Sequence, residues 1–136
     1  MTEKKNLLPL TEARGTPGEG LADEADIRRL VVTFYDVARG DGLLGPIFDA
    51  KIGDWDAHYD TMCDFWSSAV LKTGRYSGRP ASAHFGLGLT EAHFERWLSL
   101  WERVARQELG DPKAEPFVDM GRRMARAMMN VSGMLN

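Results

Sequence analysis

The sequence has only one cysteine, Cys63, among its 136 residues. A single thiol excludes an internal disulfide and is typical of proteins from a reducing compartment. No apolar run approaches the roughly 20 residues that a membrane-spanning helix requires, and the apolar run near Leu7 is too short for a signal peptide. We therefore expect a cytoplasmic protein that does not act at a membrane.

Clustered positive charge is also lacking. The net charge is −3, and the 17 basic and 20 acidic side chains are interspersed along the chain. Nucleic-acid-binding domains carry a basic face or stripe. The sequence therefore predicts no nucleic-acid partner.

Motifs for zinc, di-metal and nucleophilic sites are absent. There is no Cys-x-x-Cys or His-Glu-x-x-His for zinc, and there are no Glu-x-x-His pairs for a di-metal bundle. Cys63 and His58 lie five positions apart, which separates them around a helix, and no third group would orient them. Gly86-Leu-Gly88 lacks the strand and helix that flank a dinucleotide-binding loop.

Aromatic and methionine side chains, in contrast, are abundant: four Trp, six Phe, three Tyr and seven Met. Apolar residues recur with helical spacing, and no strand-like alternation occurs. We expect an all-α protein with a flexible leader at residues 1–22 and one domain at residues 23–136. Four substantial helices are predicted: from the N-cap Asp23 to Gly40, from the N-cap Asp54 to Gly74, from the N-cap Thr90 to Gly110, and over about 116–131. Gly42, Gly45 and Pro46 predict a turn-rich connector over residues 41–48.

Two histidines stand out against this pattern. His58 falls on the apolar stripe of the second helix, and Pro80 predicts a short helix that places His84 one turn later. A buried imidazole requires a hydrogen bond or a metal. Either histidine alone is more often structural than a ligand. Together with Tyr35 and Trp97, also on apolar faces, they indicate a functional pocket without identifying it. His93, near the start of its helix, is interpreted as a partly exposed residue.

Several strings of residues, in order and spacing, resemble the third group of truncated haemoglobins. The similarity covers about residues 23–133, and the paired-glycine motifs of the first two groups are absent, as they are in the third. The strings are Phe34-Tyr35, Leu44-Gly-Pro-Ile-Phe48, Trp55-x-x-His58, Phe65-Trp66-Ser67-Ser68, Gly74-Arg-Tyr-Ser-Gly-Arg-Pro80, His84 and His93-Phe-Glu-Arg-Trp97-Leu.

This resemblance implies a truncated globin fold that holds haem b, with His84 as the proximal iron ligand. The residues alone would allow His58 and His84 to exchange that role. On the distal side the resemblance places Tyr35, His58 and Trp97, with Met62 one turn beyond His58. It also implies apolar contacts from Phe48 and Trp66, and propionate contacts from Arg75, Tyr76 and Arg79.

The implied function is binding of oxygen, nitric oxide or cyanide at five-coordinate iron. Hydrogen bonds to a charged acceptor contribute about 1.5–3 kcal/mol each, so donors at Tyr35 and Trp97 would slow oxygen escape by on the order of 10²–10⁴-fold. Such retention favours nitric oxide dioxygenation or peroxide reduction over oxygen transport, with His58 as a gate or proton donor. No flavin or nicotinamide motif is present, so turnover would require an external reductase. A gas or redox sensor and a haem-free helical interaction module are the alternatives.

Overall fold

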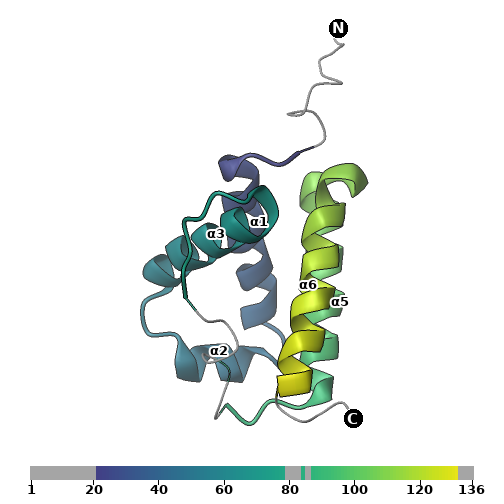
Figure 1. Ribbon diagram of the computed structural model, residues 1–136. Coiled ribbons are helices and arrows are strands. Elements are labelled where there is room, and N and C mark those ends of the chain that lie inside the picture. Colours follow the sequence, from purple (N-terminus) through teal and green to yellow (C-terminus); the bar gives the residue numbers. More distant parts are fainter. Residues whose placement is uncertain (1–20, 79–83, 85–86, 132–136) are drawn as a thin grey trace, which may run out of the picture.

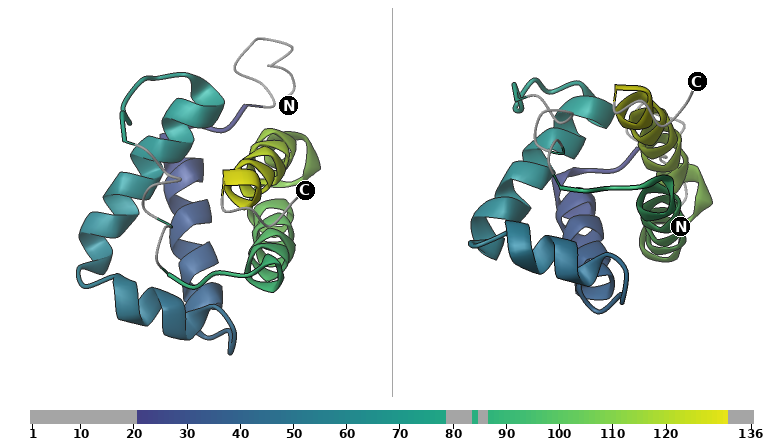
Figure 2. Two further views of the ribbon diagram at one scale, coloured as in Figure 1. Left: turned by 60° about the horizontal axis from the view of Figure 1, so that its bottom comes forward. Right: turned by 90° about the horizontal axis from the view of Figure 1, so that it is seen from below.

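The computed structural model describes residues 21–78, 84 and 87–131. Within them the chain forms α-helices and no strand, which confirms the all-α prediction. The helix α1 packs against both α3 and α5, while α5 and α6 run side by side in opposite directions (Figures 1 and 2). The helices are α1 (Glu24–Arg39), α2 (Gly45–Lys51), α3 (Trp55–Leu71), α5 (Glu91–Leu109) and α6 (Asp111–Val131).

The predicted N-caps of α1 and α3 are confirmed. Asp23 accepts a hydrogen bond from the Asp26 backbone N–H at 2.8 Å, and the Asp26 carboxylate accepts one from the Asp23 N–H at 3.1 Å. Asp54 accepts from the Ala57 N–H at 3.1 Å. Because each cap satisfies N–H groups that have no partner within the helix, these residues determine where the helices begin.

The connector predicted over residues 41–48 was wrong in part, because α2 begins at Gly45. Pro46 lies in the first turn of this helix, where a missing N–H costs nothing and the fixed φ is already helical. Gly45 is required by a close approach, since a Cβ there would lie 2.5 Å from the Arg39 carbonyl oxygen. The turn residues of the sequence therefore start a helix that packs on α1.

Two other helix boundaries differ from prediction. The helix α3 ends at Leu71, with Lys72 as a left-handed C-cap at φ 62°, before the predicted stop at Gly74. The helix α6 begins at Asp111 instead of near residue 116, so Pro112 lies in its first turn and Pro116 lies inside it. Proline is tolerated in a first helical turn, so the Asp111-Pro112 pair starts a new helix directly after Gly110.

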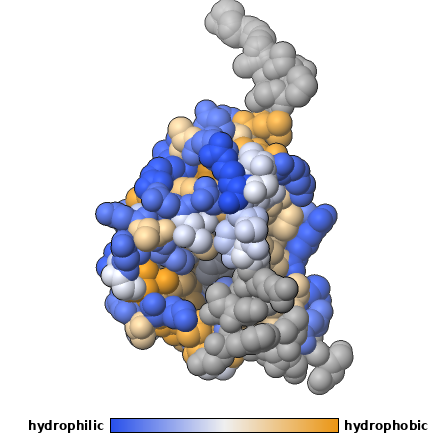
Figure 3. All heavy atoms as spheres, turned by 60° about the vertical axis from the view of Figure 1, so that its left-hand side comes forward, coloured by the Kyte–Doolittle hydropathy of each residue, from blue (hydrophilic) through white to orange (hydrophobic). Residues whose placement is uncertain are grey.

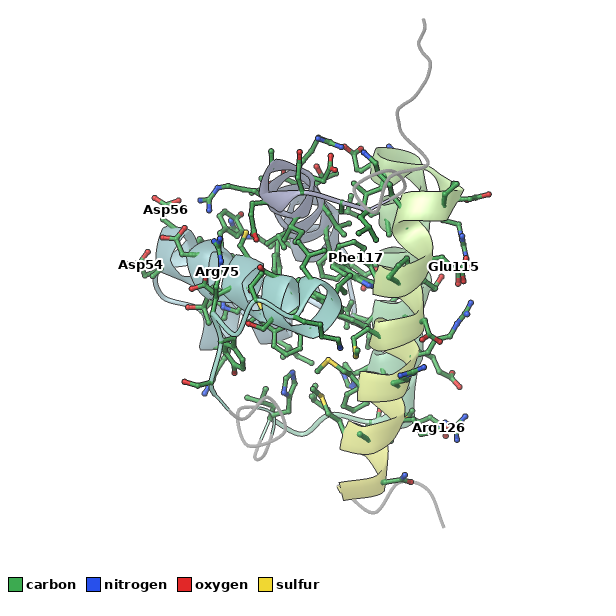
Figure 4. All side chains as sticks on the ribbon, turned by 45° about the horizontal axis from the view of Figure 1, so that its top comes forward. Asp54, Asp56, Arg75, Glu115, Phe117 and Arg126 are labelled. Atoms are coloured by element: carbon green, nitrogen blue, oxygen red, sulfur yellow. The ribbon has the colours of Figure 1, made fainter. Side chains whose placement is uncertain are left out.

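The core lies between α1, α3, α5 and α6. On α1 the predicted apolar face is buried, including Ile27, Leu30, Val31 and Phe34. From α6, Phe117 points into this core, whereas Glu115 and Arg126 point away from it (Figure 4). The buried Ala22, placed in the predicted leader, also joins the core, and the rest of that leader up to residue 20 lies outside the described residues.

No helix in the described part of the chain is long and apolar enough to cross a membrane. On the face shown in Figure 3, hydrophobic side chains gather in the lower part of the described surface, while hydrophilic ones cover much of the upper part. The lower part is the end of the molecule at which α2 lies in Figure 1.

Candidate functional site

A cavity of about 330 Å³ lies among α1, α2, α3, α5 and α6. This volume falls within the usual range of small-molecule sites, roughly 300–1,000 Å³. Of the predicted site residues that the structure describes, all except Arg75 line it; these are Tyr35, Phe48, His58, Met62, Trp66, Tyr76, His84 and Trp97. The predicted pocket residues are therefore close together in space.

Tyr35 and His58 form a hydrogen-bonded pair within this cavity. The hydroxyl of the buried Tyr35 lies 2.9 Å from His58 Nε2, joining α1 to α3. The inward hydroxyl of Tyr35 therefore has the polar partner that a buried phenol requires. Burial, with a smaller contribution from nearby Tyr59, raises the pKa of Tyr35 far above its ordinary value. Burial also lowers the pKa of the half-buried His58, so both side chains are neutral at pH 7.

Aromatic rings surround Tyr35 and restrict its position. Edge-to-face contacts come from Phe34, Phe48, Trp55 and His58, with ring centroids 5.0 to 5.4 Å from the tyrosine ring. Such contacts add favourable electrostatic energy to apolar burial. The hydroxyl therefore has a defined direction before any ligand is bound.

Trp97 lines the cavity as part of a cluster of three tryptophan rings. Its ring lies 5.4 Å from that of Trp101, which in turn lies 4.4 Å from that of Trp66, and all three are nearly parallel. The Trp101 N–H donates to the Phe117 carbonyl at 3.0 Å. The Trp97 N–H, in contrast, has no hydrogen-bond acceptor within the described residues.

His84 is half-buried in a turn and lines the same cavity as His58. The short helix predicted after Pro80 falls on residues 79–83, outside the described residues. Within the described parts of the chain, no group of three or more His, Cys, Asp or Glu side chains could hold a metal ion. A metal at this cavity would therefore take at most two ligands from these described side chains, and another group would supply the rest.

Sequence reasoning missed three polar residues that line the cavity: Lys51, Thr61 and His93. Lys51 ends α2, which was not predicted as a helix, and Thr61 lies one turn after His58. The spacing of three from His58 was a signal that could have identified Thr61. His93 is partly exposed as predicted, and its Nδ1 accepts a hydrogen bond from the Thr90 backbone N–H at 2.9 Å.

Two of the predicted propionate contacts lie elsewhere or outside the described chain. Arg75 is not among the cavity-lining residues, and its guanidinium lies 3.6 Å from the carboxylate of Glu24 at the start of α1. The same carboxylate accepts a hydrogen bond from the fully buried Ser67 at 2.7 Å. Arg79 lies outside the described residues. Of the predicted trio, Tyr76 alone is seen at the cavity wall.

Comparison with known proteins finds similarity to one family. No profile of a protein family matches the chain. The group 3 truncated hemoglobin ctb of Campylobacter jejuni subsp. jejuni serotype O:2 is 35% identical over 85 residues, which span 59% of this chain and 67% of that protein. The crystal structure of group III truncated hemoglobin from Campylobacter jejuni matches with a TM-score of 0.76 and 28% identity, covering 81% of this chain and 91% of that one.

Proposed function

Because this chain belongs to the group 3 truncated haemoglobin family, we propose that its cavity binds haem b and that diatomic gases bind there. The observation that carries the proposal is the lining of one cavity by His84, His58, Tyr35 and Trp97. A bundle without a cofactor would have no evident need for two imidazoles, a phenol and an indole at one apolar cavity. Oxygen, nitric oxide and cyanide are the proposed ligands.

The cavity residues fit a planar, largely apolar group with a metal at its centre. Phe48, Met62 and Trp66 supply apolar contact surface around it. A methionine side chain adapts to the irregular edge of a large ring, and aromatic side chains supply flat faces. His84 would coordinate the iron through an imidazole nitrogen, which is the donor that haem proteins use most widely. Haem supplies an iron with a sixth position open to a diatomic ligand.

Tyr35 and Trp97 are the proposed hydrogen-bond donors to the bound gas. The Trp97 N–H has no acceptor among the described residues, so it can donate a hydrogen bond to a ligand without breaking another one. The Tyr35 hydroxyl is already bonded to His58 Nε2, so it donates to a ligand when His58 supplies the proton of that bond or moves away. His58 would thus control which donor faces the ligand.

We propose redox chemistry on nitric oxide or peroxide in preference to oxygen transport. Strong donors retain a polarised ligand, which suits further reaction better than rapid release. Reduction of peroxide to water consumes protons, and the Tyr35–His58 pair would hold one at the cavity. Electrons would come from a separate reductase. We also propose that the protein acts in the cytoplasm.

The haem proposal is tested by a visible spectrum. We expect purified protein to show an intense Soret band that His84→Ala removes or severely weakens. His93→Ala is the matched control, since His93 lines the same cavity and is instead bonded to Thr90. A colourless protein that takes up no added haemin would contradict the proposal and favour a haem-free interaction module.

The redox proposal requires a second experiment. The oxygen-bound protein is mixed with nitric oxide in the presence of a reductant, and the number of turnovers is counted. Repeated consumption of nitric oxide supports an enzyme, whereas a single stoichiometric reaction favours a gas or redox sensor. Hydrogen peroxide, tested in the same way, separates the two proposed substrates.

A further inference from the structure

Lys51 differs from most of the basic side chains in the described structure because it has no acidic partner. Ion pairs engage the majority of the described basic side chains; they are Arg28, Arg29, Arg39, Arg75, Arg96, Arg106, Lys113, Arg122 and Arg123. Within the described residues, Lys51 has neither an ion pair nor a side-chain hydrogen bond. Its positive charge is available to a ligand.

The position of Lys51 places this charge at the mouth of the cavity. Lys51 is the only lysine or arginine among the cavity-lining residues that the structure describes, and it is itself exposed. The exposure of Thr61, another lining residue, also indicates that the cavity reaches the surface there. A lysine in such a place can lay its methylene stem along an apolar wall and keep the ammonium in water. Its location in the last turn of α2 adds a favourable interaction with the helix dipole.

We propose that Lys51 binds a carboxylate of the cofactor at the cavity mouth. This inference rests on the proposed haem function. Haem b carries two carboxylates on an otherwise apolar ring, and an ionised carboxylate cannot be buried without a partner. The carboxylate edge therefore faces the mouth, where Lys51 supplies the positive charge.

The other described candidates for this role are less well placed. Arg75 is paired with Glu24, 3.6 Å away, and does not line the cavity. The Thr61 hydroxyl donates to the Ala57 carbonyl at 3.0 Å, so its proton is committed to the helix. Tyr76 lines the cavity but is a neutral donor. Among the described residues, Lys51 is therefore the one that places a positive charge at the mouth.

The experiment compares haemin loss from the wild type, Lys51→Met and Lys72→Met. Methionine retains the length and apolar stem of lysine and removes the charge. Lys72 is an exposed lysine that bonds to the Ala69 carbonyl and does not line the cavity, so it controls for the loss of one surface charge. Transfer of haemin to an excess of apomyoglobin is followed through the Soret band. Each protein is loaded once with haemin and once with haemin dimethyl ester, which has no ionised carboxylate.

We expect Lys51→Met to lose haemin about 2–5-fold faster than the wild type, as for the loss of one solvent-exposed ion pair. Lys72→Met should lose it at the wild-type rate, and the Lys51 effect should shrink in 1 M salt because salt screens exposed charges. With the dimethyl ester, wild type and Lys51→Met should lose the cofactor at equal rates. Lys51→Glu should lose haemin faster than Lys51→Met, because it places a like charge beside the carboxylate.

Two results would overturn the inference while leaving the haem proposal intact. One is that Lys51→Met binds haemin, as its Soret band shows, and loses it at the wild-type rate. The other is an equal acceleration with haemin and its dimethyl ester, which would assign the effect to packing instead of charge. If wild-type protein forms no Soret complex, the proposed function itself fails, and the Lys51 role fails with it.

Discussion

The Tyr35 hydroxyl and the Nε2 atom of His58 lie 2.9 Å apart inside the cavity. Since burial raises the pKa of Tyr35 and lowers the pKa of His58, the pair is neutral at physiological pH. Its hydrogen bond has one proton, and the imidazole tautomer decides which atom donates. The direction in which Tyr35 offers its proton is therefore coupled to His58.

Replacing Tyr35 with phenylalanine should speed oxygen release from the haem-loaded protein by roughly 10–100-fold, because one hydrogen bond of about 1.5–3 kcal/mol to a charged acceptor is lost. Stopped-flow measurement of oxygen dissociation checks this. Tyr59→Phe is the control. The ring centroid of Tyr59 lies 5.9 Å from that of Tyr35, but Tyr59 does not line the cavity. A change of less than threefold in Tyr35→Phe would show that Tyr35 is not a ligand donor.

His58 should make the stability of the cofactor-free protein depend on pH. Burial lowers its pKa in the folded state below the ordinary value of 6.5, so the unfolded chain binds the proton more readily. The free energy of unfolding should then be highest above about pH 6.5 and decrease as pH falls through the lowered pKa. Urea unfolding between pH 5 and 8 measures this slope. It should be smaller in His58→Gln, and an unchanged slope would exclude His58 as its origin.

Substitutions at Trp97 and Trp101 should affect different properties: Trp97 the rate of oxygen release, and Trp101 the folding free energy. Trp101 is buried and its N–H donates to the Phe117 carbonyl, so Trp101→Phe should cost about 1–3 kcal/mol of folding free energy. Trp97 is half-buried and its N–H has no acceptor in the described structure, so Trp97→Phe should cost less. It should instead speed oxygen release. Similar stability losses in both variants would contradict this division.

Periodicity predicted which face of α1 is buried, because burial depends on local spacing. It placed Tyr35 and His58 on inward faces, and both side chains line the cavity. It did not reveal that these residues bond to each other, since 23 positions separate them and only tertiary packing brings them together. The helix α2 was missed because Pro46 marks both turns and helix starts.

The polar residues at the cavity mouth were predicted less well from the sequence than the residues of the cavity interior. Arg75 was a reasonable anion contact from its loop position, yet Glu24, 51 positions earlier in the chain, pairs with it. Lys51 was overlooked because an exposed lysine has no pattern in a single sequence that distinguishes it from others. Exposed polar residues acquire a role from what faces them, and this depends on the fold as a whole.

Gly121 should control the position of Trp97 from the neighbouring helix. A Cβ at this position would lie 2.9 Å from Trp101 Cδ1 and 3.2 Å from Trp97 Cζ3. Trp101 cannot shift easily, because its N–H is bonded to the Phe117 carbonyl on the same helix as Gly121. The added methyl group would therefore displace the stacked indoles. Trp97 and Trp101 both line the cavity, but Trp97 has no such hydrogen bond within the described residues and is freer to move.

Gly121→Ala should thus cost about 1 kcal/mol of folding free energy, since overpacking of about 1–3 kcal/mol exceeds the gain of up to 1 kcal/mol in helix propensity. It should also alter oxygen release, because the Trp97 N–H moves with its ring. Gly42→Ala is the control: a Cβ there meets nothing within 4 Å, so it reports only the generic effect of replacing glycine. Urea unfolding, tryptophan fluorescence and oxygen dissociation are compared in the two variants. If Gly121→Ala matches Gly42→Ala in all three, contact with Gly121 does not position Trp97.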